Sequence, residues 1–191
     1  THLLQAALRE VLGDHVHQAG SYQDAEITHF DFTHFSAVTP EELARVQKIV
    51  NDKIYESMNV TVKEMPIEEA KKMGAMALFS EKYGDTVRVV NMGGYSVELC
   101  GGTHLDNAAK VGSVHILSEG SIAAGVRRIE AVTGKRNVEG LLEMQRQFFE
   151  AAAILKVKPQ ELTEKLQSQS DEMRGMRKLI EQFKSKEALG E

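Results

Sequence analysis

The stretch VRVVNMGGYSVELCGGTH, residues 87–104, places two apolar strand patterns around a glycine pair and ends with the only cysteine of the chain. Residues 87–93 and 95–100 have the composition of β-strands. Gly93 and Gly94 between them suit a tight turn, so we predict a hairpin. Cys100 ends the second strand, and Gly101 with Gly102 would let the backbone turn until His104 approaches the same point.

Short strands and helices follow one another on both sides of this hairpin. Helix 39–58 has the clearest start, because Thr39, Pro40 and Glu42 form a capping box with proline at the first helical position. Strand follows strand more often than helix, which predicts an α+β domain built on an antiparallel or mixed sheet with packed helices. The other predicted helices are 3–12 and 67–74, and the other predicted strands are 28–32, 60–65, 113–120 and 125–134.

The pattern changes near residue 137, where glycine becomes sparse and helix formers dominate. We therefore divide the chain into a domain at 1–136 and a helical arm at 137–191. Pro159 separates two helical segments, and the second repeats apolar residues at alternating spacings of four and three, as a coiled-coil seam does. Two helices joined by a short turn predict an antiparallel hairpin or coiled coil. The seam positions are Leu141, Met144, Phe148, Ala152, Leu155, Leu162, Leu166, Gln169, Met173, Met176, Ile180 and Phe183.

Composition excludes several classes of protein. The chain has 191 residues, 42% of them hydrophobic, and a formal net charge of −5, which argues against a generally basic surface that coats nucleic acid. No run approaches the ~20 apolar residues of a membrane span. The single cysteine excludes an internal disulfide and suits a reducing, cytoplasmic setting. The first residue is Thr rather than Met, so we expect a processed chain or a segment of a longer one.

Cys100 and His104 are candidate zinc ligands, because cysteine and histidine are the donors that zinc prefers. His2 is the best third candidate, since it begins a helix on which a second histidine four residues upstream would share its face. His34 and His115 lie next to or within predicted strands, where a structural role is the better interpretation. On spacing alone, both a zinc site and a buried thiol beside a turn stay open.

Five stretches of the chain carry a resemblance to a known family. They are THLLQAALREVLGDHVHQAGS (1–21), FDFTHF (30–35), GAMALFSEKYGDTVRVVNMG (74–93), SVELCGGTH (96–104) and SEGSIAAGVRRIEAVTG (118–134). Together they resemble the editing domain of alanyl-tRNA synthetases, which belongs to the threonyl/alanyl-tRNA synthetase second additional domain superfamily. The resemblance covers residues 1 to about 136, and the following residues resemble the helical segment after that domain. The CGGTH turn fits the alanyl branch better than the threonyl branch.

The resemblance implies a zinc-dependent deacylase that hydrolyses serine or glycine from tRNA(Ala), as part of a synthetase that binds ATP elsewhere. It implies His2, Cys100 and His104 as metal ligands, with a fourth ligand, a histidine, three residues before Thr1 and outside this chain. It further implies that Gln18 and Thr1 act in the catalytic pocket. Without the resemblance, Gln18 reads as a solvated loop amide and Thr1 as a frayed terminus.

Implied partners are the acceptor end of tRNA(Ala), the other domains of the synthetase and, through the helical arm, a second copy of the chain. Arg127, Arg128, Lys135 and Arg136 are candidate phosphate contacts, although a salt-bridged strand end explains them equally well. Two alternatives stay open. One is a free-standing deacylase with the same site. The other is a non-enzymatic tRNA-binding scaffold whose arm mediates oligomerisation.

Overall fold

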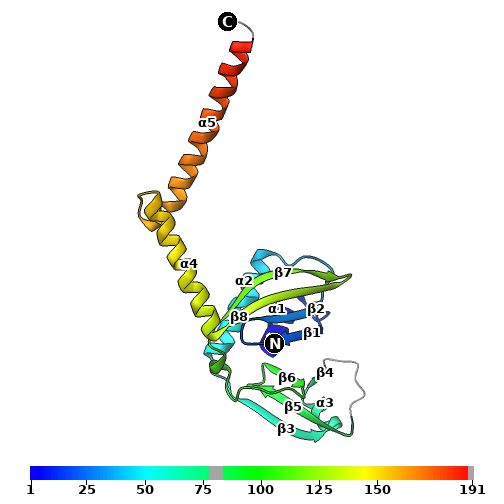
Figure 1. The fold of residues 1–191 in the computed structure, drawn as a ribbon. Coiled ribbons are helices and arrows are strands. Elements are labelled where there is room, and N and C mark those ends of the chain that lie inside the picture. Colours follow the sequence, from blue (N-terminus) through cyan, green and yellow to red (C-terminus); the bar gives the residue numbers. More distant parts are fainter. Residues whose placement is uncertain (78–83, 189–191) are drawn as a thin grey trace. The chain divides into compact units, whose positions relative to one another are not determined.

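The computed structural model describes residues 1–77 and 84–188 of the chain (Figure 1). Residues 78–83 lie outside the described residues. They belong to the stretch 74–93, which is one of the five that carry the family resemblance. The chain divides into two compact units, residues 1–138 and residues 139–191.

The first unit contains a four-stranded antiparallel sheet in the order β1–β2–β8–β7. Two helices pack on this sheet, and their apolar faces share its core (Figure 1). Phe30 and Phe32 are fully buried at the centre, with Leu8 and Val46 supplied by the helices. The elements are α1 (His2–Leu12), β1 (Gln18–Gln23), β2 (Thr28–Thr33), α2 (Pro40–Tyr55), β7 (Val114–Ala123) and β8 (Val126–Thr133).

A second four-stranded sheet in the same unit has the order β3–β5–β6–β4. The pairing of β4 with β6 is parallel and the other pairings are antiparallel, so this sheet is mixed. Its smaller core includes Ala70 of α3 and Val87, Val89 and Leu99 of the sheet. The elements are β3 (Val60–Pro66), α3 (Ile67–Lys72), β4 (Met76–Ala77), β5 (Thr86–Met92) and β6 (Ser96–Leu99). The 3-10 helix η1 (Ala108–Val111) follows them in the chain and contacts α2.

The hairpin predicted around the glycine pair is confirmed as β5–β6. Gly93 and Gly94 have φ values of 60° and 79°, in the region that side chains disfavour. A Cβ on Gly93 would also lie 2.7 Å from Sδ of Met58, so glycine is needed there for space as well as for conformation.

The capping box of the second helix is also confirmed. The Glu42 amide donates to Oγ1 of Thr39 at 3.2 Å, and the Thr39 amide donates to Oε2 of Glu42 at 2.8 Å. Val46, Val50 and Ile54 are buried, which fixes the inward face of α2.

Two features differ from the sequence prediction. The α+β class is correct, but the strands form two sheets rather than one. Gln18, expected in a loop, begins strand β1. The sequence QAGSYQ lacks the apolar alternation of a half-buried strand, because β1 is an edge strand whose side chains are exposed or half-buried.

The second unit contains the continuation of α4 (Gly134–Ile154), the 3-10 helix η2 (Pro159–Glu161) and α5 (Leu162–Ala188). The two predicted helices are therefore present. Their antiparallel packing is not confirmed, because most of the seam residues stay exposed. Among the side chains described in residues 139–185, the buried seam residues are Ala152 and Leu162, which lie beside the turn between the helices. The exposed seam residues are Leu141, Met144, Phe148, Leu166, Met173, Met176, Ile180 and Phe183.

No helix in the described residues is long and apolar enough to cross a membrane.

His34 is a buried histidine just beyond β2. Its Nδ1 shares a hydrogen bond of 2.8 Å with Nε2 of His15, and its Nε2 lies 3.3 Å from Oγ of Ser36. Burial lowers the pKa of His34 below its ordinary value of 6.5, and the neighbouring His15 lowers it further, while Glu42 acts in the opposite direction. The folded chain therefore resists protonation of this ring.

We expect Phe32→Ala to lower the free energy of unfolding of the first unit by about 3–5 kcal/mol, because it leaves a cavity in a fully buried site. Phe35→Ala is the matched control, since that ring is 82% exposed and its loss should cost no more than about 0.5 kcal/mol. Urea unfolding followed by circular dichroism measures both. Equal losses in the two variants would contradict the assigned core.

The lowered pKa of His34 predicts that stability falls as the pH drops below about 6.5, its ordinary pKa. In that range the unfolded chain takes up a proton that the folded chain refuses, so the unfolded state gains. His34→Gln removes this contribution and should flatten the pH dependence of the unfolding free energy between about pH 7 and 5.5. His17→Gln, which removes an exposed imidazole nearby, tests whether loss of any histidine has the same effect. An unchanged slope in His34→Gln would reject the assignment.

Candidate metal centre

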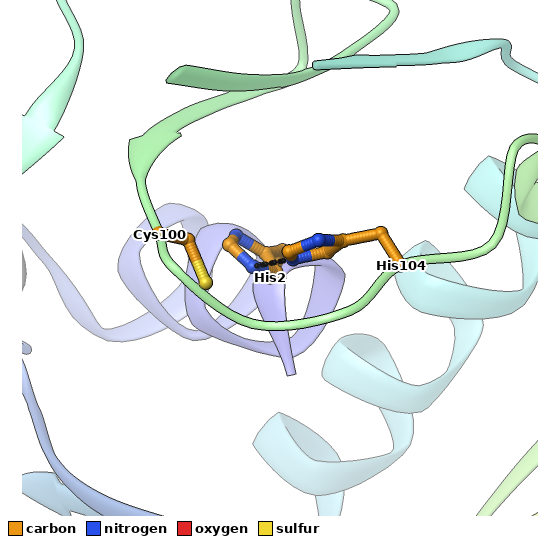
Figure 2. Close-up of side chains that lie close together, drawn as sticks. All are labelled: His2, Cys100 and His104. Carbon is orange, nitrogen blue, oxygen red and sulfur yellow. Dashed lines mark hydrogen bonds between the residues drawn. The ribbon is translucent and has the colours of Figure 1, made fainter. Parts of the chain in front are cut away.

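Three potential metal ligands from distant parts of the sequence lie together in the first unit. They are His2 at the start of α1, Cys100 directly after β6, and His104 at the end of the turn that follows (Figure 2). Their ligand atoms all lie within 4.8 Å of one another. Nε2 of His2 and Nε2 of His104 are 3.0 Å apart. Figure 2 shows the sulfur of Cys100 turned toward the same two rings.

A buried carboxylate supports His2 from behind. Oε2 of Glu98 lies 2.6 Å from Nδ1 of His2, and the two side chains are 2% and 7% exposed. Neither atom has a different hydrogen-bond partner among the described residues, and Oγ of Ser96 donates to the other carboxylate oxygen at 2.8 Å. When Nδ1–H donates to a carboxylate, the lone pair of Nε2 stays free to bind a metal ion. Histidines that bind metal ions commonly donate such a hydrogen bond to a carboxylate.

His104 is kept available as a neutral donor. Burial lowers its pKa below the ordinary value of 6.5, and the charges of His2 and Arg88 lower it further, although a hydrogen bond with the Gly102 backbone acts in the opposite direction. An imidazole must be neutral to offer its lone pair to a metal ion, so the lowered pKa favours the binding form near neutral pH.

The donor set fits a metal ion. Two imidazole nitrogens and one thiol are ligands that transition-metal ions such as zinc accept, at about 2.0–2.1 Å for nitrogen and 2.3 Å for sulfur. Two nitrogens bound tetrahedrally at such lengths stand about 3.3 Å apart, close to the observed 3.0 Å between the His2 and His104 nitrogens. The cluster could therefore hold an ion with little movement of these two rings.

The cluster opens into a cavity of about 1080 Å³ within the first unit, lined by both sheets and by the start of α1. Thr1 and Gln18, the two residues suggested as catalytic, both line it. Gln18 extends from the edge strand β1, and its Nε2 donates to Oγ of Ser21 at 3.2 Å. Thr1 is the N-cap of α1, and its side chain makes no capping hydrogen bond.

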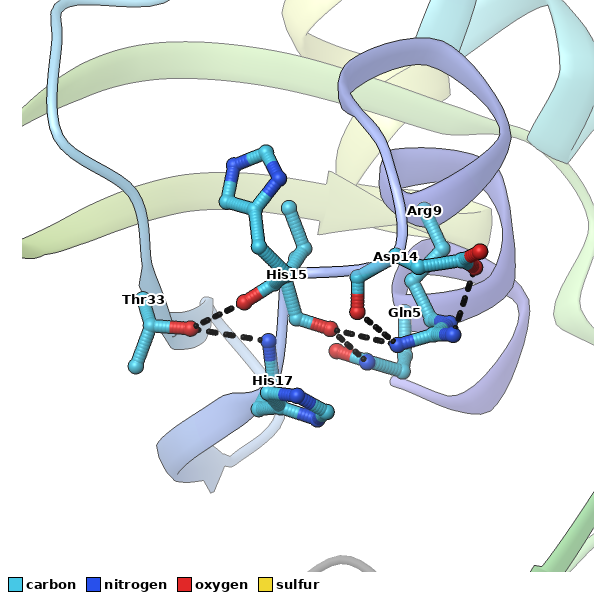
Figure 3. Close-up of polar contacts among 7 residues, drawn as sticks. Gln5, Arg9, Asp14, His15, His17 and Thr33 are labelled. Carbon is cyan, nitrogen blue, oxygen red and sulfur yellow. Dashed lines mark hydrogen bonds and ion pairs between the residues drawn. The ribbon is translucent and has the colours of Figure 1, made fainter.

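Hydrogen bonds fasten the connection between α1 and β1, directly before Gln18 (Figure 3). The Val16 carbonyl accepts from Nε2 of the buried Gln5 at 3.0 Å and from Nη1 of Arg9 at 3.1 Å. Oγ1 of Thr33 donates to the His15 carbonyl and accepts from the His17 amide, both at 2.9 Å. These contacts fasten both sides of the connection, so the strand that carries Gln18 starts from a fixed point.

The arginines suggested as phosphate contacts are engaged with carboxylates. Arg128 forms a bidentate pair with Asp31 across β8 and β2, at 2.7 and 2.9 Å. Such pairing neutralises the charge that a phosphate would need. The other pairs are Arg127 with Glu119 and Arg136 with Glu26.

Two residues of this site were missed from the sequence, Glu98 and Arg88. Residues two apart on a strand share a face, so Ser96 and Glu98 on β6 share the face on which Cys100 follows. Applying that period to SVELC would have placed the acid beside the thiol. Arg88 lies on β5, and its carbonyl accepts from the Cys100 amide at 3.1 Å.

Comparison with known proteins relates the chain to aminoacyl-tRNA synthetases. Residues 87–130 match the family model described as the threonyl and alanyl tRNA synthetase second additional domain. The chain is 51% identical to an alanine–tRNA ligase of Acetivibrio thermocellus over 186 residues, 97% of this chain and 21% of that protein. It is 52% identical to an alanine–tRNA ligase of Lysinibacillus sphaericus over 168 residues, 88% of this chain and 18% of that protein.

An alanine–tRNA ligase of Listeria monocytogenes is 49% identical over 186 residues, again 97% of this chain and 21% of the relative. The chain thus spans about a fifth of the length of the curated relatives that it matches. Identity at this level over nearly the whole chain establishes homology to one segment of those proteins. The chain is therefore a homologue of a segment of the alanine–tRNA ligases, the segment that contains the threonyl and alanyl tRNA synthetase second additional domain.

Proposed function

We propose that the first unit is an editing deacylase that hydrolyses serine or glycine from mischarged tRNA(Ala), with zinc bound by His2, Cys100 and His104. The observation that carries the proposal is the convergence of these three ligands at the wall of a large cavity. Homology to alanine–tRNA ligases supports the choice of substrate.

The chemical need for such a site follows from the size of alanine. A pocket built for alanine cannot exclude the smaller glycine by sterics, and it rejects the added hydroxyl of serine only weakly. A second site that destroys the wrong product is then required. Its substrate is an ester, which water attacks readily, so the site has to position the ester and a water molecule rather than break a strong bond.

The cavity suits a substrate of this size. Its volume of about 1080 Å³ is slightly above the ~300–1,000 Å³ typical of small-molecule sites, which leaves space for an aminoacyl group together with its terminal nucleoside. Gln18, Ser21 and Thr28 of the first sheet are polar residues that line the cavity, which the metal cluster also borders.

In this proposal the metal ligands, Glu98, Gln18 and Thr1 have separate roles. Zinc, when bound, would polarise the ester carbonyl, activate water or hold the amino group of the substrate. Glu98 fixes the orientation of His2 through Nδ1. The amide of Gln18 and the hydroxyl of Thr1 are the candidate hydrogen-bonding partners for the ester or for the serine hydroxyl. Partners of this activity are the acceptor end of tRNA(Ala) and the remaining domains of a longer ligase.

The exposed seam of α5 is a candidate packing surface for a further helix, from a second copy or from another part of a longer chain. Its apolar residues include Met173, Ile180 and Phe183, at 52%, 53% and 69% exposure. The exposed seam does not discriminate between the two alternatives, a free-standing deacylase and a non-enzymatic scaffold. Hydrolysis of the ester of mischarged tRNA would exclude the non-enzymatic scaffold. The same hydrolysis by the isolated chain would support a deacylase that acts independently.

We expect the chain to bind one zinc or cobalt ion, with a thiolate-to-cobalt charge-transfer band that reports the sulfur ligand. Cys100→Ser should remove that band and weaken binding by at least about tenfold, since it replaces the softest donor. His17→Ala, which removes an exposed histidine outside the cluster, should leave the spectrum unchanged. A wild-type cobalt spectrum in Cys100→Ser would reject the centre.

For hydrolysis we expect Cys100→Ala to reduce deacylation of seryl-tRNA(Ala) by on the order of a hundredfold or more, the loss of several kcal/mol of transition-state stabilisation. The assay uses the chain extended upstream to include the histidine that the resemblance implies. Gln18→Ala should have a smaller effect, up to about tenfold, because it removes one hydrogen bond of about 1 kcal/mol. Both proteins should keep the wild-type circular dichroism spectrum, because neither side chain belongs to the hydrophobic cores. Wild-type deacylation by Cys100→Ala would refute the proposed active centre.

A further inference from the structure

Arg88 fastens the backbone of the turn that carries two of the three ligands. Its Nη1 donates to the carbonyl of Cys100 at 2.6 Å and to the carbonyl of Gly102 at 2.7 Å. Its own carbonyl accepts from the Cys100 amide at 3.1 Å. Arg88 of β5 thus makes three contacts with the turn, two with Cys100 and one with Gly102, the residues on either side of Gly101.

The turn needs such support because of its composition. Glycine loses more conformational freedom on ordering than any other residue, and two glycines follow Cys100 directly. A Cβ on Gly101 would meet nothing within 4 Å, so side-chain packing does not hold the chain at that position. Hydrogen bonds from a charged guanidinium are about twice as strong as neutral ones, which suits Arg88 to hold two carbonyls.

The guanidinium has no competing ion pair in the described part of the chain. Arg127 and Arg128 are each paired with a carboxylate, whereas the hydrogen bonds of the Arg88 side chain go to the turn carbonyls. Arg88 also lines the cavity that the metal cluster borders. The hydrogen bonds of its guanidinium are therefore directed at the ligand turn.

We propose that Arg88 is a positioning residue for the metal centre, which holds Cys100 and His104 in their binding arrangement before the ion arrives. The inference rests on the metal centre proposed above. With the turn already ordered, ion binding does not have to supply the free energy of fixing two glycines. Supporting residues of this kind typically change metal affinity by about 10–100-fold.

The test compares Arg88→Met with Lys63→Met in the metal-free and metal-loaded chain. Lys63 is an exposed residue of the neighbouring strand β3, so its variant also replaces one positive charge of the sheet by Met, at a position that makes none of the contacts with the turn. Zinc affinity is measured by competition with a chromophoric chelator, and cobalt spectra report the ligand geometry. We expect Arg88→Met to bind zinc about 10–100-fold more weakly, and Lys63→Met to match the wild type.

A second readout needs no ion. Backbone NMR order parameters of residues 101–104 in the metal-free protein should fall from rigid values of about 0.85 toward about 0.6 in Arg88→Met only. If Arg88→Met fails to fold, Arg88→Lys keeps the charge on a shorter side chain with fewer donors, and it should show a smaller loss in both measurements.

This inference would be overturned if a folded Arg88 variant bound zinc within twofold of the wild-type affinity and had wild-type order parameters within error. The proposed metal centre would be unaffected by that result. A wild-type chain that binds neither zinc nor cobalt would overturn the metal centre and this inference with it. Equal weakening by Lys63→Met would show that loss of charge on the sheet, not the contacts to the turn, is responsible.

Discussion

The register between β5 and β6 is the constraint on which the candidate site depends. Val90 stands opposite Glu98 and Val89 opposite Leu99. This pairing puts Glu98 and the side chain of Arg88 at the level of the ligand turn, while Val89 and Leu99 enter the smaller core. A slip by one residue would move every side chain of β6 to the other face, so the apolar contacts of the core also set the place of the polar residues.

That arrangement requires a carboxylate in an apolar setting, which is costly unless its oxygens are satisfied. Glu98 is 2% exposed, and its two oxygens are taken by Oγ of Ser96 and by the His2 ring. The partner of the acid is thus the same ring that offers Nε2 to the cluster. Removing either member would leave a buried polar group without its partner, so the two are expected to be replaced together if at all.

Much of the local structure could be predicted because it follows from short-range rules. The glycine pair predicted the β5–β6 hairpin, and Thr39 with Glu42 predicted the start of α2. Strand β1 could not be predicted, since an edge strand with exposed side chains carries no periodic apolar signal. Division into two sheets is a long-range outcome that no local pattern encodes. The α4–α5 seam has the spacing of a coiled coil, but spacing alone does not say which helix covers it.

The candidate ligands were suggested by residue type. Glu98 shares the strand face of Cys100, but no motif links it to His2 of a distant helix. The contacts of Arg88 to backbone carbonyls leave no motif either. His2 belongs to a helix whose Leu4, Ala7 and Leu8 are buried in the larger core, whereas Cys100 follows a strand of the smaller one. An ion bound by both would act as a cross-link between two hydrophobic cores, across 98 residues of chain. By mass action, the free energy of unfolding of the unit would then rise with the free ion concentration. The rise is about 2.7 kcal/mol when that concentration is a hundred times the dissociation constant.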